Sequence, residues 1–105
     1  MNETYRKQIE EAWDCRQRLA EPQYKEAVLA VVDLMDKGAL RVAERGADGW
    51  HVNEWVKKAV LLYFGVCDMA TCEVGPFEFH DKIPLKHGYA TQGVRVVPHA
   101  IARHG

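Results

Sequence analysis

The sequence lacks serine altogether, and its 105 residues include only three threonines. It also lacks a P-loop, a GxGxxG segment and an HExxH motif, so the local signatures of nucleotide-binding and zinc-protease sites are missing, as is a Ser-His-Asp order. No apolar run approaches the ~20 residues that a membrane-spanning helix needs. The polar, acidic residues 1–5 do not resemble a signal peptide. We therefore expect a cytoplasmic protein without a membrane partner and without catalytic machinery of its own.

Cysteine is also scarce. Three cysteines at irregular spacing are typical of a reducing compartment rather than of a disulfide framework. Cys67 and Cys72, followed by His80 and His87, are residue types that bind zinc, but their spacing matches no standard zinc knuckle. Alternation along a strand is expected to bury Cys72. We expect structural cysteines and no metal site, with a zinc-dependent structural domain as an alternative.

Acidic residues are absent after Asp81. The first 81 residues carry 10 Lys and Arg against 15 Asp and Glu, whereas the tail carries four cations, Lys82, Lys86, Arg95 and Arg103. A formal net charge of -1 argues against wholesale binding of nucleic acid. The acid-free tail indicates a local site for an anion. The alternative is that these cations pair with carboxylates of the first 81 residues.

The residues that are present predict one globular domain. Hydrophobic residues make up 48% of the chain and charged residues 28%, in a mass of 12.0 kDa. Trp13, Trp50 and Trp55 all fall on positions that we expect to face the core. They are therefore read as packing residues, and no nucleic-acid partner is expected.

Hydrophobic periodicity predicts three main helices, over residues 2–19, 22–37 and 54–64. Pro22 suits the first turn of the second helix. Gly38 is expected to end that helix in a left-handed conformation, and Asn53 to cap the third. Gly65 is expected to end the third helix.

Between and after these helices the period changes to two. Alternating apolar residues on either side of 46–49 predict a hairpin, and two further extended runs flank Gly75-Pro76. The segments 83–85 and 93–98 are also expected to be extended. The fold class is therefore α+β, a small helical domain with three main helices and β-hairpins.

The tail has a second pattern. Val96 and Ala102 lie six residues apart, with the small residue Ala100 four after Val96. This spacing is typical of the first coil of a left-handed parallel β-helix, which needs stacked neighbours to bury its face. We therefore expect residues 1–93 to form an N-terminal helical and hairpin domain, and residues 94–105 to begin a hexapeptide-repeat β-helix that is truncated here.

Four ordered stretches carry a family resemblance: GALRVAE at 38–44, WVKKAVLL at 55–62, DKIPLK at 81–86 and GVRVVP at 93–98. Together they resemble the N-terminal domain of tetrahydrodipicolinate N-succinyltransferase, over essentially the whole chain. The resemblance implies transfer of succinyl from succinyl-CoA, the co-substrate, to the amine of ring-opened tetrahydrodipicolinate in lysine and diaminopimelate biosynthesis. It also implies a homotrimer of left-handed β-helices, with no cofactor bound to this chain.

The resemblance assigns a role to one residue directly. Arg95 in GVRVVP matches the family's acceptor-binding arginine, and a guanidinium can make two parallel hydrogen bonds to a carboxylate of the amino-dicarboxylate acceptor. Lys86 and Lys82 are further candidates for the same anionic pocket, without a family match. Asp81 is expected to pair with a cation rather than act as a base. No catalytic residue is expected in this chain, and the chain alone is expected to be inactive.

Two departures from the family pattern leave alternatives open. The segment between Lys86 and Arg95 is shorter than is usual in the family, so a related acyltransferase of a secondary-metabolite pathway, such as the tabtoxin pathway, could share this domain. The second departure is the missing β-helix. A stand-alone, non-enzymatic binding module that kept the domain is the remaining alternative.

Overall fold

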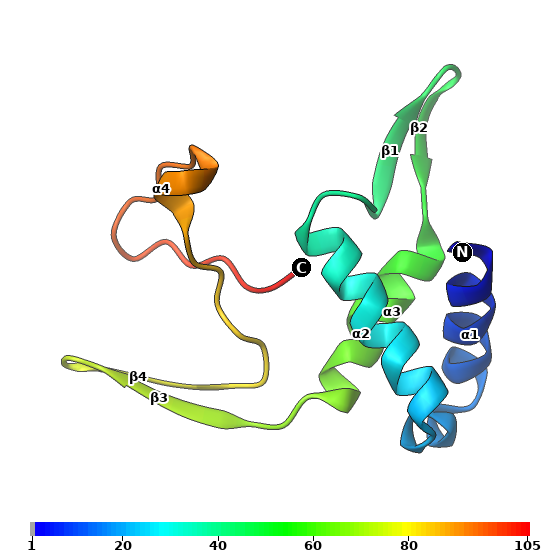
Figure 1. Ribbon diagram of the computed structural model, residues 1–105, viewed down its shortest axis with the longest axis horizontal. Coiled ribbons are helices and arrows are strands. Elements are labelled where there is room, and N and C mark those ends of the chain that lie inside the picture. Colours follow the sequence, from blue (N-terminus) through cyan, green and yellow to red (C-terminus); the bar gives the residue numbers. More distant parts are fainter. Residues whose placement is uncertain (1) are drawn as a thin grey trace. The chain divides into compact units, whose positions relative to one another are not determined.

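The computed structural model describes residues 2–105, and its fold is α+β as predicted (Figure 1). The chain divides into two compact units. The helical unit comprises Met1–Asp68 together with Gly105, and the hairpin unit comprises Met69–His104. Within residues 2–105 we find no helix that combines the length and the apolar character needed to span a membrane.

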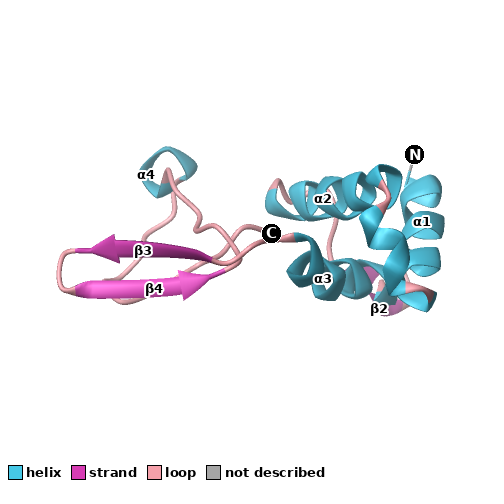
Figure 2. Ribbon diagram, turned by 90° about the horizontal axis from the view of Figure 1, so that it is seen from below, coloured by secondary structure: helices cyan, strands magenta, loops and turns pink. Residues whose placement is uncertain are grey.

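Three helices form the core of the helical unit: α1 (Asn2–Asp14), α2 (Pro22–Asp36) and α3 (Glu54–Val66). Each of them contacts the other two, and Figure 2 shows them side by side. Their apolar stripes meet in the middle, where the largest fully buried side chains are Ile9, Val28, Val31, Val56 and Leu62. The core is therefore built from the positions that the helical periodicity selects.

The first helix is shorter than predicted. It ends at Asp14 rather than at residue 19, Cys15 is extended, and a 3-10 turn, η1 (Arg16–Ala20), leads into α2. The turn reverses the chain and brings Arg18 to α2, where its guanidinium donates to the Tyr24 hydroxyl at 2.7 Å. That hydroxyl donates in turn to Glu11 at 2.9 Å.

The predicted end of α2 at a left-handed Gly38 is confirmed. Gly38 has φ 75°, and the N–H groups of Gly38 and Ala39 donate to carbonyls of the last turn at 3.0 and 2.9 Å. The predicted cap at Asn53 is wrong in its mechanism, because the side-chain amide donates to the Arg41 carbonyl at 2.8 Å and makes no cap hydrogen bond. The prediction that Gly65 ends α3 is also wrong, since the helix continues through it to Val66.

The predicted hairpin around 46–49 is present, as strands β1 (Ala43–Gly46) and β2 (Gly49–Val52) paired antiparallel. In Figure 1 it projects from the helices, and no residue of either strand is buried. Trp50 is 70% exposed, so the expectation that it faces the core is wrong. The other two tryptophans contact the helical core: Trp55 is buried, and Trp13 is half-buried with the Arg16 guanidinium 4.4 Å from its ring centre.

The hairpin unit contains β3 (Ala70–Val74) and β4 (Phe77–Asp81), which pair antiparallel across Gly75-Pro76 as predicted. Every residue of β3 is exposed, so alternation produces no buried face and the expected burial of Cys72 is wrong. A short helix that the sequence did not predict, α4 (Tyr89–Gln92), follows. Residues 94–102 contain no strand, and the β-helix expected from residue 94 stays a prediction.

Candidate functional site: two hollows in the hairpin unit

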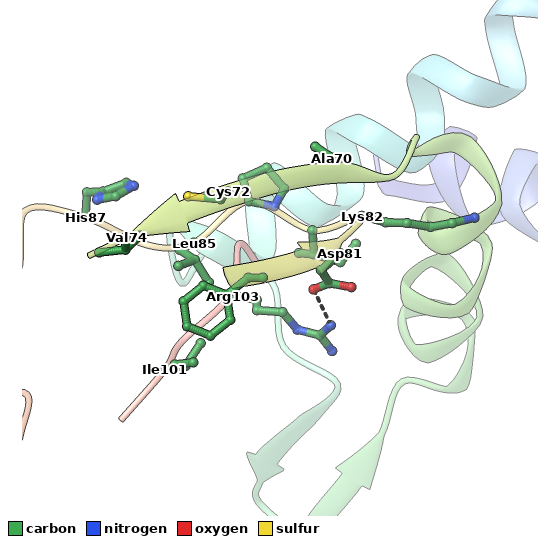
Figure 3. A pocket seen from close by; sticks show the side chains of 12 residues that line it. Ala70, Cys72, Val74, Asp81, Lys82, Leu85, His87, Ile101 and Arg103 are labelled. Atoms are coloured by element: carbon green, nitrogen blue, oxygen red, sulfur yellow. Dashed lines mark hydrogen bonds and ion pairs between the residues drawn. The ribbon is translucent and has the colours of Figure 1, made fainter. Parts of the chain in front are cut away.

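Two hollows lie within Met69–His104. The first, called here the hairpin hollow, has a volume of about 460 Å³ and is floored by apolar side chains of both strands and of residues 83–85 (Figure 3). The second, the C-terminal hollow, has a volume of about 440 Å³ and is lined by residues of α4 and of the segment 94–102. An antiparallel bridge between Leu85 and Arg103 brings residues 101–103 beside residues 83–85, and both segments line the hairpin hollow.

An ion pair lies at the edge of the hairpin hollow. The Arg103 guanidinium donates to the Asp81 carboxylate at 3.0 Å, and Figure 3 shows the two side chains joined. The backbone N–H of Lys82 donates to the same carboxylate and, together with Arg103, holds the pKa of Asp81 below its ordinary value. The prediction that Asp81 pairs with a cation is confirmed.

The three predicted acceptor-binding residues do not share one hollow. Arg95 and Lys86 line the C-terminal hollow, whereas Lys82 lines the hairpin hollow. The sequence places Lys82 only four residues before Lys86, but the chain bends at Ile83, which is the one buried hydrophobic residue of the unit among those described. The C-terminal hollow therefore brings together two of the predicted residues.

Arg95 is exposed at the wall of the C-terminal hollow. Within residues 2–105 its guanidinium makes no ion pair or hydrogen bond, so its five N–H donors are open to a ligand. No acidic residue lines this hollow. Much of its lining is hydrocarbon, from Val94, Val96–Val97 and Ala100–Ala102.

The two explanations of the acid-free tail fare differently for the two arginines: pairing is confirmed for Arg103, and the anion site stays a prediction for Arg95. Arg103 pairs with a carboxylate of the first 81 residues, as the alternative predicts. Arg95 faces a hollow without acidic groups, as the anion-site prediction requires. The two outcomes are separated by only eight residues of sequence.

Hydrogen bonds within the loop hold the wall that carries Lys86. Its backbone N–H donates to the Ala102 carbonyl at 2.9 Å, which ties this side of the loop to the tail. At the next turn, the Thr91 hydroxyl donates to the Gly88 carbonyl at 2.9 Å and the Gln92 amide to the His87 carbonyl at 3.0 Å. The first of these bonds joins the loop to Ala102, and the other two close the turn over residues 87–92.

Tyr89 and Gln92 also line the C-terminal hollow, and neither was predicted from the sequence. They lie on α4, whose four residues are too few for a hydrophobic period to show. The available signal was the pair of glycines on either side: Gly88 and Gly93 have φ 75° and 71°, a conformation that other residues rarely adopt.

In the described part of the chain, no cluster of metal-ligating side chains supports the alternative of a zinc-dependent domain. Among residues 2–105, no three His, Cys, Asp or Glu side chains are grouped so as to hold a metal ion. His80 instead has its Nδ1 2.7 Å from the Thr71 hydroxyl, across the β3–β4 ladder. Cys67 lies near Tyr63, where burial and a hydrogen bond with Cys67 raise the pKa of the tyrosine to about 12.

Comparison with known proteins identifies what the chain is similar to. Residues 4–66 match the family model described as "Tetrahydrodipicolinate N-succinyltransferase N-terminal". Relatives named 2,3,4,5-tetrahydropyridine-2,6-dicarboxylate N-succinyltransferase include one of Thiobacillus denitrificans, 49% identical over 109 residues, and one of Bordetella pertussis, 45% identical over 107 residues. Each of these matches covers 92% of this chain and 39% of the relative.

A third relative, of Ralstonia nicotianae, is 44% identical over 116 residues and covers 100% of this chain and 42% of its own length. The chain thus spans about two fifths of the length of the curated relatives it matches. Because the match extends over 116 positions and this chain has 105 residues, the Ralstonia protein has residues in the matched region that this chain lacks. The match does not place these residues along the chain, so the short Lys86–Arg95 segment stays a prediction.

Proposed function

This chain belongs to the family of tetrahydrodipicolinate N-succinyltransferase N-terminal domains, and from that premise we propose that it forms the acceptor-binding part of an N-succinyltransferase. The enzyme transfers succinyl from succinyl-CoA to the amine of ring-opened tetrahydrodipicolinate, a step of lysine and diaminopimelate biosynthesis. The amine attacks the thioester carbonyl, an amide forms, the C–S bond breaks and the CoA thiol leaves. The enzyme works as a cytoplasmic homotrimer.

One observation carries this proposal: the Arg95 guanidinium lies at the wall of a hollow that has no acidic residue. A carboxylate can accept two parallel hydrogen bonds from a guanidinium, which fixes the direction as well as the position of the acceptor. Lys86 adds a second positive charge to the same hollow. The aliphatic walls match the hydrocarbon chain that joins the two carboxylates of the acceptor.

The contribution of this chain to the reaction is positional. Holding the acceptor so that its amine faces the thioester replaces a collision between two molecules by a reaction within one complex. The C-terminal hollow has no carboxylate or histidine among its lining residues to serve as a general base for the amine. The acidic catalytic group and the succinyl-CoA groove belong to the rest of the enzyme.

A chimeric enzyme tests the proposal. The 105-residue chain is joined to the part of the Thiobacillus denitrificans relative that follows its matched region, in place of that relative's own N-terminal part. The expected result is release of CoA that depends on both tetrahydrodipicolinate and succinyl-CoA. The relative's C-terminal part alone is the control and should show no acceptor-dependent release. A folded, trimeric chimera without transfer would contradict the proposal and favour the non-enzymatic binding module.

A further inference from the structure

The C-terminal hollow contains a phenol that the proposed function leaves without a role. Tyr89 is half-buried and lines the hollow together with Arg95. Its backbone carbonyl is used, since it accepts the N–H of Val94 at 3.0 Å. Its hydroxyl makes no hydrogen bond with any residue of the described range 2–105. A tyrosine that is partly removed from water usually finds a partner for its hydroxyl, so this donor is available to a ligand.

The backbone that carries Tyr89 is fixed on both sides. Gly88 and Gly93 hold left-handed conformations before and after α4, and the N–H of Gly93 donates back to the carbonyls of α4. The hydrogen bonds of Thr91 and Gln92 to the carbonyls of Gly88 and His87 close the other side of the turn. The phenol is therefore carried by a preorganised turn rather than by a free loop.

Besides Lys86 and Gln92, two donors of different kinds line this hollow together with aliphatic side chains. Arg95 is charged and suits a carboxylate, and Tyr89 offers a single neutral O–H. Val96, Val97 and Ile101 supply the apolar surface. A ligand that has a carboxylate at each end of an aliphatic chain uses all three features, whereas a monocarboxylate leaves one donor unused.

From this arrangement we propose that Tyr89 is a positioning and specificity residue: its hydroxyl donates a hydrogen bond to the second carboxylate of a dicarboxylate whose first carboxylate is held by Arg95. The inference rests on the proposed function, because the acceptor proposed there is a dicarboxylate. It adds the residue that distinguishes a dicarboxylate from a ligand with one carboxylate. It also assigns the short α4 turn a role in acceptor selection.

Two probes that differ by one carboxylate test the inference: pimelate, a seven-carbon dicarboxylate, and heptanoate, the corresponding monocarboxylate. Each is titrated into the 105-residue chain at low salt, and binding is followed through amide shifts in NMR spectra. Tyr89→Phe should weaken pimelate binding about tenfold, because a hydrogen bond to a charged group is lost. It should leave heptanoate binding unchanged. Arg95→Gln should weaken both probes.

Tyr5→Phe, which removes a hydroxyl from α1 in the helical unit, is the matched control and should bind both probes as the wild type does. Tyr89→Phe keeps the ring, so an unchanged amide spectrum verifies that the turn is intact. The inference is overturned if Tyr89→Phe binds pimelate as tightly as the wild type, if it weakens heptanoate equally, or if the wild-type chain does not bind pimelate. Succinyl transfer by the chimera judges the proposed function separately, so a failure of one is distinguishable from a failure of the other.

Discussion

At the scale of the residue, Arg95 and Arg103 differ in one contact, an ion pair with a carboxylate. Both are exposed cations of an acid-free segment. Arg103 is 3.0 Å from a carboxylate and is committed to structure, whereas Arg95 faces a hollow with no acidic residue. The charge pattern could not say which cation of the segment pairs with a carboxylate, since the Leu85–Arg103 bridge that brings Arg103 beside Asp81 is a contact between distant residues.

Replacing Arg95 tests its role in the active chimera. Arg95→Gln should lower kcat/KM, mainly through a higher KM for tetrahydrodipicolinate, because a carboxylate loses its charged partner. The corresponding loss of transition-state stabilisation should be about 2–5 kcal/mol. The KM for succinyl-CoA should stay nearly unchanged. Arg45→Gln, on the exposed strand β1, removes an arginine far along the chain from the hollow and is the control. Unchanged acceptor kinetics in Arg95→Gln would remove Arg95 from the site.

The Asp81–Arg103 pair gives a prediction for pH. Because the folded pKa of Asp81 is lowered, the pair contributes stability above the ordinary carboxyl pKa of 3.8, and this contribution is lost as the pH falls through the lower folded pKa. Arg103→Gln should raise the pKa of Asp81 toward its ordinary value. The measurement is a carbon-detected NMR titration of the Asp81 carboxyl group, with Arg45→Gln as the control. An unmoved midpoint would mean that the Lys82 N–H alone sets the pKa.

At the scale of the element, the sequence predicted the helices that pack into a buried core. It was less successful for the exposed hairpins and for the short α4 turn. The three helices were found because their apolar stripes meet in one core. Trp50 and Cys72 were expected to be buried because alternation assumes a covered face, but both hairpins have only two strands and none of their residues is buried. The turn that carries Tyr89 was missed because four residues hold no period. The role of Arg95 was predicted from a family resemblance, not from periodicity.

Two glycines of the helical unit should respond oppositely to the same substitution. Gly38 has φ 75° with open space around a Cβ, so Gly38→Ala costs only conformational strain, about 1–2 kcal/mol. Gly65 lies inside α3, and a Cβ there would meet Leu19 at 3.4 Å. Gly65→Ala should therefore stabilise the unit by about 0.5–1 kcal/mol. Urea unfolding followed by circular dichroism measures both, and a destabilised Gly65→Ala would show that the Leu19 side chain cannot yield.

At the scale of the whole molecule, the hydrophobic core is distributed unequally. Among the described residues, every buried hydrophobic side chain except Ile83 lies in the helical unit. A two-stranded hairpin without such a core is marginally stable in water. The part of the molecule that carries both hollows is therefore the less stable part, and the helical unit is the stable scaffold of the chain. Ligand-binding segments are commonly drawn from the less stable regions of a fold.

This distribution predicts two classes of amide hydrogen exchange. Amides of α1–α3 should exchange through global unfolding, and those of β3–β4 through faster local opening. Ile9→Val, at a fully buried position, should cost about 0.5–1.5 kcal/mol and speed exchange in the three helices alone. Ile101→Val, at a position that is 56% exposed in the hairpin unit, should leave the helices unchanged. Exchange followed by NMR measures both variants. If Ile9→Val sped exchange equally in β3–β4, the two units would unfold as one cooperative structure, because a loss of core packing in the helices would then be felt by the hairpin as well.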